Sequence, residues 1–297
     1  MAIKRALMVG VMGLCALTGA WAQQDFSKVE ISTQKVADGI YMLQGRGGNI
    51  GVSVGEDGVF IIDDQYAPLT DKIKKALATL SDKPVRFVLN THYHGDHTGG
   101  NENLGKGGAI IVAHDNVRKR LAAGQFIKAF NTTMPPAPAK ALPVVTFSSE
   151  VTFHWNNQTL AVKHIAPAHT DGDAVIFFED ANVLHTGDLY FNGFYPFIDA
   201  NAGGSLKGMI DGVNKLLASI NDQTKVIPGH GPLSNKAELK AFRDMLATVH
   251  ARLLALTAAG KSVEEIIASK PIADLEAEWG DGFLPTDTWL RIVLDGM

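Results

Sequence analysis

The stretch that decides the fold occupies residues 91–100 and reads Thr91-His92-Tyr93-His94-Gly95-Asp96-His97-Thr98-Gly99-Gly100. It holds three histidines and an aspartate, and it directly follows an apolar run of β type at residues 85–89. One face of a regular helix cannot present these four side chains together, whereas a tight loop at a strand end can. Imidazole and carboxylate are ligands that Zn²⁺ and similar divalent ions accept. The stretch therefore predicts a metal-binding loop rather than a solvated polar turn.

The first 22 residues have the pattern of a secretory signal peptide. Lys4 and Arg5 precede an apolar run at residues 6–17, and Ala20-Trp21-Ala22 fits a small-x-small cleavage site. The run is short for a membrane span. We therefore expect a signal peptide at residues 1–22, a single domain at residues 23–297 and a periplasmic or secreted protein. No membrane association is expected after cleavage.

Composition narrows the classes of partner. The one cysteine, Cys15, lies in the expected signal peptide, so the mature chain would offer a metal only N and O ligands. Cleavage would remove two positive charges, Lys4 and Arg5, and take the formal net charge from −4 to −6. A mildly acidic chain without a basic run is a poor nucleic-acid binder. We expect a small-molecule substrate, and the oligomeric state stays open.

Hydrophobic periodicity predicts two successive sets of strands and helices. The first set has strands at residues 40–43, 50–54, 59–62, 85–89 and 109–113, with helices at 69–80 and 116–121. A proline-rich loop at residues 131–143 follows, and then strands at residues 144–147, 151–155, 160–165, 174–178 and 183–185. The last elements are a helix at 206–220, a strand at 225–228, a long helix capped by Ser234 and a short helix that begins with a capping box at Ser262. This order is typical of an α/β (α+β) protein with two similar halves, sheets inside and helices outside.

Three later side chains share the style of the opening stretch. His169, Asp188 and His230 each come shortly after an expected strand, with glycine close by. Each alone could be an ordinary loop residue, but their joint occurrence indicates one site. Asp63 and Asp64 end another strand, where a carboxylate either anchors a metal-binding histidine or is simply solvated. His114 and His250 are interpreted as structural, since each lies at a helix junction or beside an apolar stripe.

The pattern His92-x-His94-x-Asp96-His97, followed by His169, Asp188 and His230, resembles the metallo-β-lactamase fold superfamily from about residue 39 to residue 232. The resemblance implies an αββα sandwich that binds two metal ions at the edge of its two sheets. It implies three histidines on the first ion, an aspartate and two histidines on the second, and one bridging aspartate: His92, His94 and His169; Asp96, His97 and His230; Asp188. The ions would be two Zn²⁺, with Fe or Mn as alternatives.

The resemblance also implies hydrolysis by a hydroxide that bridges the two ions and opens a cyclic amide or ester carbonyl. Asp96 is the candidate catalytic residue, because it could orient the nucleophile or accept a proton. Asp63 and Thr170 are candidates for supporting the ligands.

Export makes a β-lactam the first substrate to consider. A lactonase or a thioesterase of the glyoxalase II type is the alternative, with Tyr190 as a candidate lactonase-like tyrosine. An iron-dependent persulfide dioxygenase-like protein, or a metal-binding module without turnover, is a remote alternative. Asp188 excludes the β-lactamase subclass with a cysteine ligand, and Phe191 stands where that subclass has a lysine for the substrate carboxylate. Residues 131–143 and 190–197 could each belong to the core or line the pocket.

Overall fold

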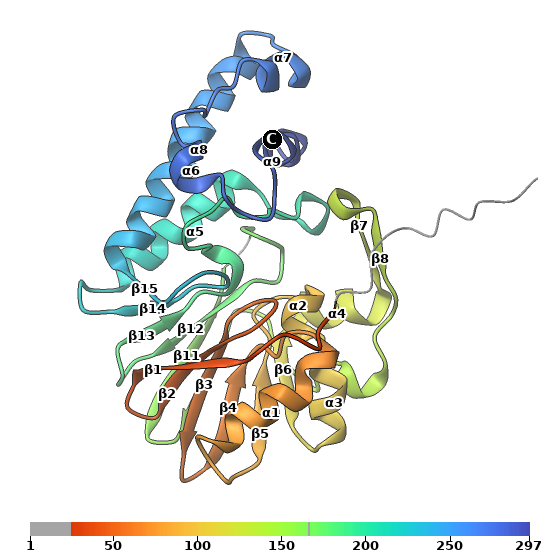
Figure 1. Ribbon diagram of the computed structural model, residues 1–297, viewed down its shortest axis with the longest axis vertical. Coiled ribbons are helices and arrows are strands. Elements are labelled where there is room, and N and C mark those ends of the chain that lie inside the picture. Colours follow the sequence, from red (N-terminus) through yellow and green to blue (C-terminus); the bar gives the residue numbers. More distant parts are fainter. Residues whose placement is uncertain (1–24, 166) are drawn as a thin grey trace, which may run out of the picture.

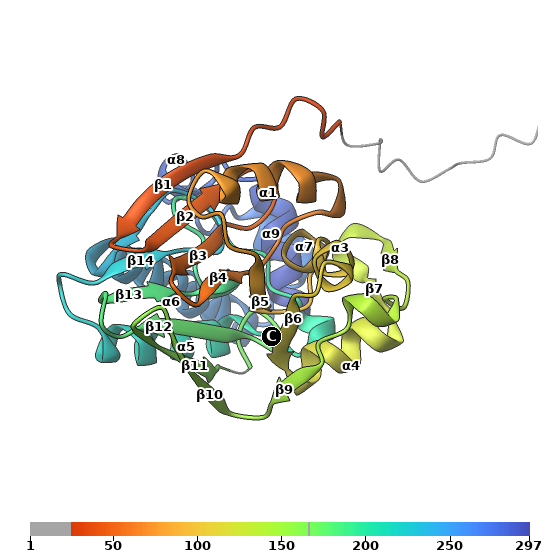
Figure 2. The ribbon, with the colours of Figure 1, turned by 90° about the horizontal axis from the view of Figure 1, so that it is seen from below.

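The computed structural model describes residues 25–165 and 167–297, so the expected signal peptide lies outside the described residues. Two sheets pack face to face, and helices cover their outer faces (Figure 1, Figure 2). The αββα sandwich predicted from the sequence is therefore confirmed. Among the described residues, no helix combines the length and the apolarity that a membrane crossing requires.

The first sheet contains seven of the described strands in the order β1-β2-β3-β4-β5-β6-β9. The strands are β1 (Ser32–Ala37), β2 (Ile40–Gln44), β3 (Ile50–Gly55), β4 (Gly58–Ile62), β5 (Val85–Leu89), β6 (Ile110–His114) and β9 (Val145–Phe147). Strands β1 to β4 pair antiparallel, and β4, β5, β6 and β9 pair parallel. Strand β9 corrects the expectation that residues 144–147 open the second half, because its pairing with β6 completes the first sheet.

Helices of the first half lie in the connections of this sheet. They are α1 (Thr70–Ala78), α2 (Gly95–Thr98), α3 (Asn101–Lys106) and α4 (Asp115–Ala123). A parallel strand pair needs a crossover connection, and these helices provide it. As a result, the carboxyl ends of β4, β5 and β6 meet at one edge of the sheet.

The second sheet contains six of the described strands in the order β10-β11-β12-β13-β14-β15. They are β10 (Glu150–Trp155), β11 (Gln158–His164), β12 (Ala174–Phe178), β13 (Val183–His185), β14 (Lys225–Ile227) and β15 (Ser234–Asn235). The helices of this half are α5 (Leu206–Ser219), α6 (Lys236–Ala258), α7 (Val263–Ala268), α8 (Glu276–Trp279) and α9 (Thr286–Asp295). Helices α5 and α6 lie beside the second sheet, on the side away from the first (Figure 1).

Strand β4 shows why the fold needs layers on both of its faces. Alternate side chains of a strand point to opposite faces of the sheet. Phe60 and Ile62 belong to the core cluster between the two sheets, whereas Val59 and Ile61 belong to the cluster under α1. All four are buried, so a continuous apolar run is required here instead of an alternating one.

The beginning of α6 differs from the sequence prediction. Asn235 is the N-cap, and its side-chain oxygen accepts hydrogen bonds from the backbone N–H groups of Ala237 and Glu238. The predicted cap, Ser234, lies in β15 and donates its hydroxyl to the Glu238 carboxylate. Both residue types are good caps, so pattern alone could not choose between neighbours. The capping box at Ser262 is confirmed.

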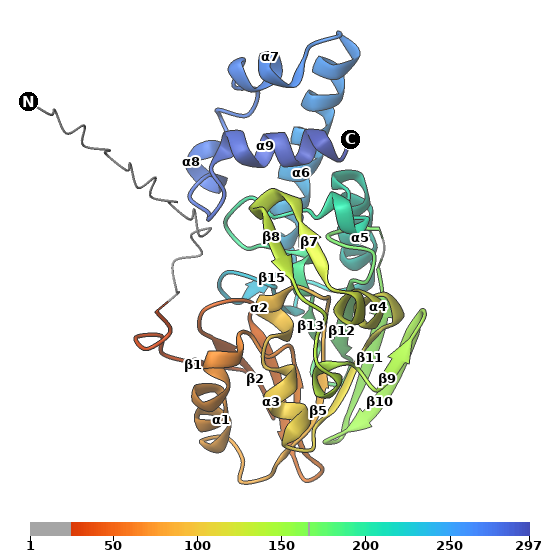
Figure 3. The same cartoon turned by 90° about the vertical axis from the view of Figure 1, so that its right-hand side faces the viewer.

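The proline-rich segment is partly ordered as a hairpin. Strand β8 (Thr132–Met134) pairs with β7 (Gln125–Ile127) in a small separate sheet, so the prediction of a plain loop is wrong for these three residues. Figure 3 shows the hairpin directly below α9. Lys128, between the two strands, forms an ion pair with Asp295 at the end of α9, with N and O 3.0 Å apart. The hairpin therefore joins the first half to the C-terminal helices.

Helix α9 is held to the body of the protein by a buried tryptophan. The Trp289 ring stacks on Tyr195 with centroids 4.2 Å apart and planes 8° from parallel. Its indole N–H donates to the Pro196 carbonyl over 2.6 Å. Trp289 is fully buried, so this contact fixes both α9 and the segment around residues 195–197.

We predict that Trp289→Ala lowers the free energy of unfolding by about 3–5 kcal/mol, because it removes a large buried ring and leaves the Pro196 carbonyl without its donor. Trp289→Phe keeps an aromatic ring in place and should cost clearly less. Urea denaturation followed by circular dichroism measures both. A Trp289→Ala variant within about 1 kcal/mol of the wild type would contradict the anchoring role.

Candidate metal centre

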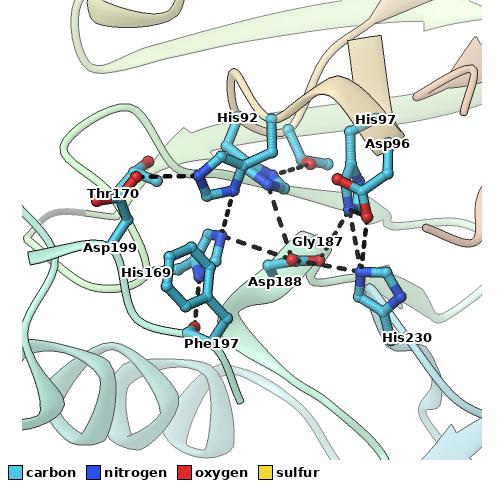
Figure 4. A network of polar contacts seen from close by, with 12 residues as sticks. His92, Asp96, His97, His169, Thr170, Gly187, Asp188, Phe197, Asp199 and His230 are labelled. Atoms are coloured by element: carbon cyan, nitrogen blue, oxygen red, sulfur yellow. Dashed lines mark hydrogen bonds and ion pairs between the residues drawn. The ribbon is translucent and has the colours of Figure 1, made fainter. Parts of the chain in front are cut away.

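The seven candidate ligands lie together at one edge of the sandwich. They are delivered by four segments that each follow a strand: the segment after β5, which includes the short helix α2, carries four of them, and the segments after β11, β13 and β14 carry one each. Figure 4 shows these side chains around Asp188. The members are His92, His94, Asp96, His97, His169, Asp188 and His230. The structure therefore brings together all seven residues that the sequence singled out, although they span 139 positions of the chain, from 92 to 230.

The side chains form two groups that meet at one carboxylate. The potential ligand atoms of the first group lie within 4.8 Å of one another, and the same holds for the second group: His92, His94, His169 and Asp188; Asp96, His97 and His230. Asp188 faces both groups. Its Oδ2 lies 3.5 Å from His169 Nε2 and 3.4 Å from His230 Nε2. Asp188 thus has the position expected of a bridging residue.

The outer ring nitrogens of four histidines are held by protein acceptors. His97 Nδ1 donates to Asp63 over 2.7 Å, and His169 Nδ1 donates to the Phe197 carbonyl over 2.8 Å. His92 Nδ1 lies 3.0 Å from the Thr91 hydroxyl, and His94 Nε2 lies 3.1 Å from Asp199. These contacts put the proton on the outer nitrogen and leave a lone pair on the inner one. Each ring therefore turns a metal-competent atom toward the centre.

The inner atoms fit a cation and are poorly satisfied by one another. His94 Nδ1 and His169 Nε2 are 2.9 Å apart, and His97 Nε2 and His230 Nε2 are 3.3 Å apart. With their protons on the outer nitrogens, His94 and His169 turn lone pairs toward each other, and lone pairs at this distance repel. The inner nitrogen of His92 and one oxygen of Asp188 are buried without a hydrogen-bond partner, which is costly in a protein interior. A set of imidazole and carboxylate donors around these atoms therefore fits divalent metal ions.

Electrostatics support neutral imidazoles at His92 and His169. Burial lowers the pKa of His169 to about 4 and holds the pKa of His92 well below its usual range. Burial opposes charge on Asp188, but the surrounding imidazoles keep the pKa of that carboxyl well below its usual range. Neutral imidazole and ionised carboxylate are the protonation states that bind metal ions.

Asp63 supports the second group, as predicted. It accepts from the backbone N–H and the hydroxyl of Thr91, both over 2.7 Å, as well as from His97. Asp64 is fully buried and accepts from the Gly100 N–H over 2.8 Å. The alternative of a solvated carboxylate pair is therefore wrong for both. Burial raises the pKa of Asp64 well above its usual range, and the Asp64 backbone N–H donates to the His97 carbonyl over 2.9 Å.

The outcomes of three other expectations differ. Tyr190 is fully buried, and its hydroxyl contacts Ser234 Oγ at 2.8 Å, so it cannot serve as a lactonase-like tyrosine facing substrate. Thr170 contacts Asp173 and braces the loop of His169 from behind. His114 is structural as predicted, because it accepts from the Asn116 N–H and contacts the Ser148 carbonyl.

Asp199 was not predicted from the sequence; it orients His94 and also accepts from the Tyr93 hydroxyl. Asp199 follows the aromatic run at residues 190–197, and no local motif marks it. Asp199 lies about a hundred positions from both of its partners. The available signal in the sequence was the position of Asp199 just after a segment that could line the pocket.

A cavity of about 630 Å³ opens onto the centre. Both segments that the sequence had left undecided contribute to its apolar wall, through Met134 and through Phe191 and Phe197. The rest of this wall comes from Ile127 and Phe130 and from Phe283 in the C-terminal region. Arg46 and Tyr66 line the cavity beside Asp96. Burial, followed by the charge of Asp96, raises the pKa of Tyr66 above its usual range. The phenol is therefore a neutral hydrogen-bond donor near neutral pH.

Comparison with known proteins agrees with this geometry. The profile described as "Metallo-beta-lactamase superfamily" matches residues 43–230. The chain belongs to this superfamily.

Two curated relatives are named as hydrolases. A "Hydroxyacylglutathione hydrolase" of Pelagibacter ubique (strain HTCC1062) is 26% identical over 161 residues, which cover 53% of this chain and 57% of that protein. The "Probable metallo-hydrolase YqgX" of Bacillus subtilis (strain 168) is 24% identical over 188 residues, 58% of this chain and 83% of that protein. The match thus spans little more than half the length of the Pelagibacter relative.

Solved structures share the fold. A metallo-beta-lactamase from Pontibacter korlensis aligns with a TM-score of 0.62 and 20% identity, over 73% of this chain and 99% of that one. The sec-alkylsulfatase Pisa1 from Pseudomonas sp. aligns with a TM-score of 0.64 and 21% identity, over 89% of this chain and 49% of that one. At these identities the likeness concerns the fold alone.

We predict that Asp63→Asn weakens binding of the second metal ion about 10–100-fold, because the amide cannot hold His97 as the carboxylate does. Competition with a chromophoric chelator measures the affinity. Asp64→Asn is the matched control: it changes the adjacent buried carboxyl, whose side chain accepts from the Gly100 N–H and forms no hydrogen bond with a candidate ligand side chain. Equal affinities for Asp63→Asn and the wild type would show that Asp63 does not support the site.

Proposed function

We propose that this chain is an exported, metal-dependent hydrolase that binds two Zn²⁺ ions. Its reaction is the cleavage of a cyclic amide or ester carbonyl in a small molecule. The observation that supports this most directly is the pair of imidazole and carboxylate groups that share Asp188 at the floor of an open cavity. Structural metal sites are closed by protein ligands, whereas catalytic sites face a cavity. Two bound ions would supply a water of lowered pKa and polarise the carbonyl.

The side chains have distinct roles in this proposal. His92, His94 and His169 would hold one ion, Asp96, His97 and His230 would hold the other, and Asp188 would hold both. Asp96 is the candidate ligand carboxylate that combines solvent exposure with a place in the cavity wall: its side chain is 25% exposed, against 5% for Asp188. Asp96 can therefore orient the attacking water and take up its proton.

A β-lactam is our first candidate substrate. Such molecules combine an apolar side chain, a strained cyclic amide and a carboxylate, and the cavity combines an aromatic wall with one arginine. The place of the lysine that receives the carboxylate in one β-lactamase subclass is taken by Phe191, which stacks on His230 with centroids 5.0 Å apart. A β-lactam carboxylate would therefore need another partner, and Arg46 is available in the lining of the cavity.

A thioesterase of the glyoxalase II type is the second candidate, favoured by the Pelagibacter relative named as a hydroxyacylglutathione hydrolase. Glutathione carries two carboxylates. Among the described lining residues, Arg46 is the one cation apart from the candidate histidines, and the C-terminal region contributes the apolar Phe283. The cavity thus suits a glutathione thioester less well than a lactam or a simpler ester.

We predict that Asp188→Ala lowers the occupancy of the second ion and the activity together. Removing the shared carboxylate would leave the two metal ions without the anion between them. Metal content is measured by plasma mass spectrometry, and turnover is measured with a β-lactam, a lactone and a glutathione thioester. Full activity of Asp188→Ala would refute the bridging role. Absence of turnover on all three by a wild-type protein with two ions bound would refute the substrate candidates.

We predict that the protein recovered from a periplasmic or culture-medium fraction begins at Gln23, because Ala20-Trp21-Ala22 fits the recognition pattern of the cleaving peptidase. Intact-mass spectrometry of the purified protein gives the N-terminus. Recovery of the chain from the cytoplasm with residues 1–22 still attached would contradict export.

A further inference from the structure

The cavity over the metal centre has two walls of opposite character. One wall carries Arg46, on the turn between β2 and β3, and Tyr66, on the segment after β4. The other wall is apolar and contains Phe130, Phe197 and Phe283. Asp96, Asp188 and His230 lie among the lining residues with both walls. A molecule that lies over the centre therefore meets a cationic side and an aromatic side.

Arg46 stands out among the arginines of the described part of the chain. Five others form hydrogen bonds or ion pairs with protein groups: Arg118, Arg120, Arg243, Arg252 and Arg291. Arg46 and Arg86 have no such partner within the described residues. Arg86 lies at the start of β5, at the far end of that strand from the centre. Arg46 is the unpaired guanidinium at the cavity, and its field reaches the Tyr66 phenol.

The turn that carries Arg46 has a fixed backbone. The Gly48 N–H donates to the Asp96 carbonyl over 3.1 Å, and Gln65 Nε2 donates to the Gly48 carbonyl over 2.7 Å. A Cβ on Gly48 would lie 2.1 Å from the His97 ring, so the turn packs directly against a candidate ligand. The guanidinium therefore extends from a turn whose backbone is hydrogen-bonded to the segment that carries Asp96. Such an ordered backbone limits the conformational entropy that is lost when Arg46 binds a ligand.

The aromatic wall is partly open to solvent. The Phe283 side chain is 56% exposed, and the Phe130 ring lies 6.4 Å from it and 4.8 Å from the Phe197 ring, centroid to centroid. These rings come from three separate segments: the β7–β8 hairpin, the segment after β13 and the loop before α9. An exposed aromatic ring that joins two more buried rings in a cavity wall indicates an apolar ligand group.

We propose that the substrate is an amphipathic anion: Arg46, assisted by the Tyr66 hydroxyl, binds its anionic group, and the ring wall of Phe130, Phe197 and Phe283 binds its apolar group. This arrangement places the scissile carbonyl between the two walls, over the metal centre. The inference rests on the proposed hydrolase function and narrows its substrate class. It makes Arg46 a specificity-determining residue in contact with substrate.

A matched pair of esters tests the charge requirement. The phenylacetyl ester of 4-hydroxybutanoate and that of 4-hydroxybutanamide differ in one charge and share the scissile bond and the ring. We expect the wild type to prefer the anion in kcat/KM by about tenfold or more, as charge-assisted hydrogen bonds allow. Arg46→Gln should lose this preference, while its kcat/KM for the uncharged ester of 4-hydroxybutanamide changes by less than about twofold.

Arg86→Gln is the matched control, because it removes the other unpaired arginine, at the end of β5 remote from the cavity. It should keep the preference of the wild type. The inference is overturned if Arg46→Gln discriminates between the two esters as the wild type does, or if the wild type does not prefer the anion.

A binding measurement separates the inference from the proposed function. The amides 4-(phenylacetamido)butanoate and 4-(phenylacetamido)butanamide replace the labile ester, and calorimetry compares their affinities for the metal-loaded protein. A direct contact between carboxylate and metal would survive Arg46→Gln, so the change caused by this variant isolates the arginine. If neither ester is turned over but the anion binds more tightly and Arg46→Gln removes the difference, the hydrolase proposal fails and the binding proposal stands. If both esters are turned over without charge discrimination, the hydrolase proposal stands and the binding proposal fails.

Phe283→Ala tests the apolar wall independently of charge. It should raise KM for the phenylacetyl esters by roughly fivefold and leave KM for the corresponding acetyl esters nearly unchanged, because part of the ring's buried surface is lost. Equal effects on both acyl groups would remove the ring wall from the proposal.

Discussion

The mutual repulsion of inward-facing imidazole nitrogens is the constraint on which the rest of the structure depends. His94 and His169 turn lone pairs toward each other at 2.9 Å in the protein interior. Such an arrangement is unfavourable unless a cation lies between them. The protein holds it in place from behind, with Asp199 and the Phe197 carbonyl fixing the outer nitrogens. The protein itself thus positions the nitrogens of His94 and His169 for a metal ion.

The sandwich brings the ends of strands from both sheets together at the metal centre. A loop after β5 in the first sheet and loops after β11, β13 and β14 in the second supply the candidate ligands. Packing of the two sheets, through side chains such as Phe60 and Phe178, sets the distance between these loops. The buried face of each sheet therefore acts on the site indirectly, and a shift between the sheets would separate one half of the donor set from the other.

The sequence predicted the local part of this architecture well. The spacing of His92 to His97 is short, and the strand before it is strongly apolar, so both could be interpreted without the fold. His169, Asp188 and His230 became members of one site through their order along the chain, which the resemblance to a family supplied. Strand β9 was assigned to the wrong half, because three residues of β type carry no information about which sheet they join.

Long-range partners could not be predicted. Asp199 and Tyr66 belong to no motif, and the contacts that give them meaning join segments far apart in the sequence. Aromatic residues such as Phe283 look like ordinary core candidates until the fold leaves them exposed at a cavity. Substrate recognition in this protein is therefore encoded in tertiary contacts, whereas the metal-binding pattern is encoded in short spacing.

An anomalous-scattering map from crystals of the zinc-loaded protein tests the central claim most directly. The account predicts two peaks per chain, one enclosed by His92, His94 and His169 and the other by Asp96, His97 and His230, with Asp188 in contact with both. A single peak at full occupancy, or two peaks that Asp188 does not join, would contradict it.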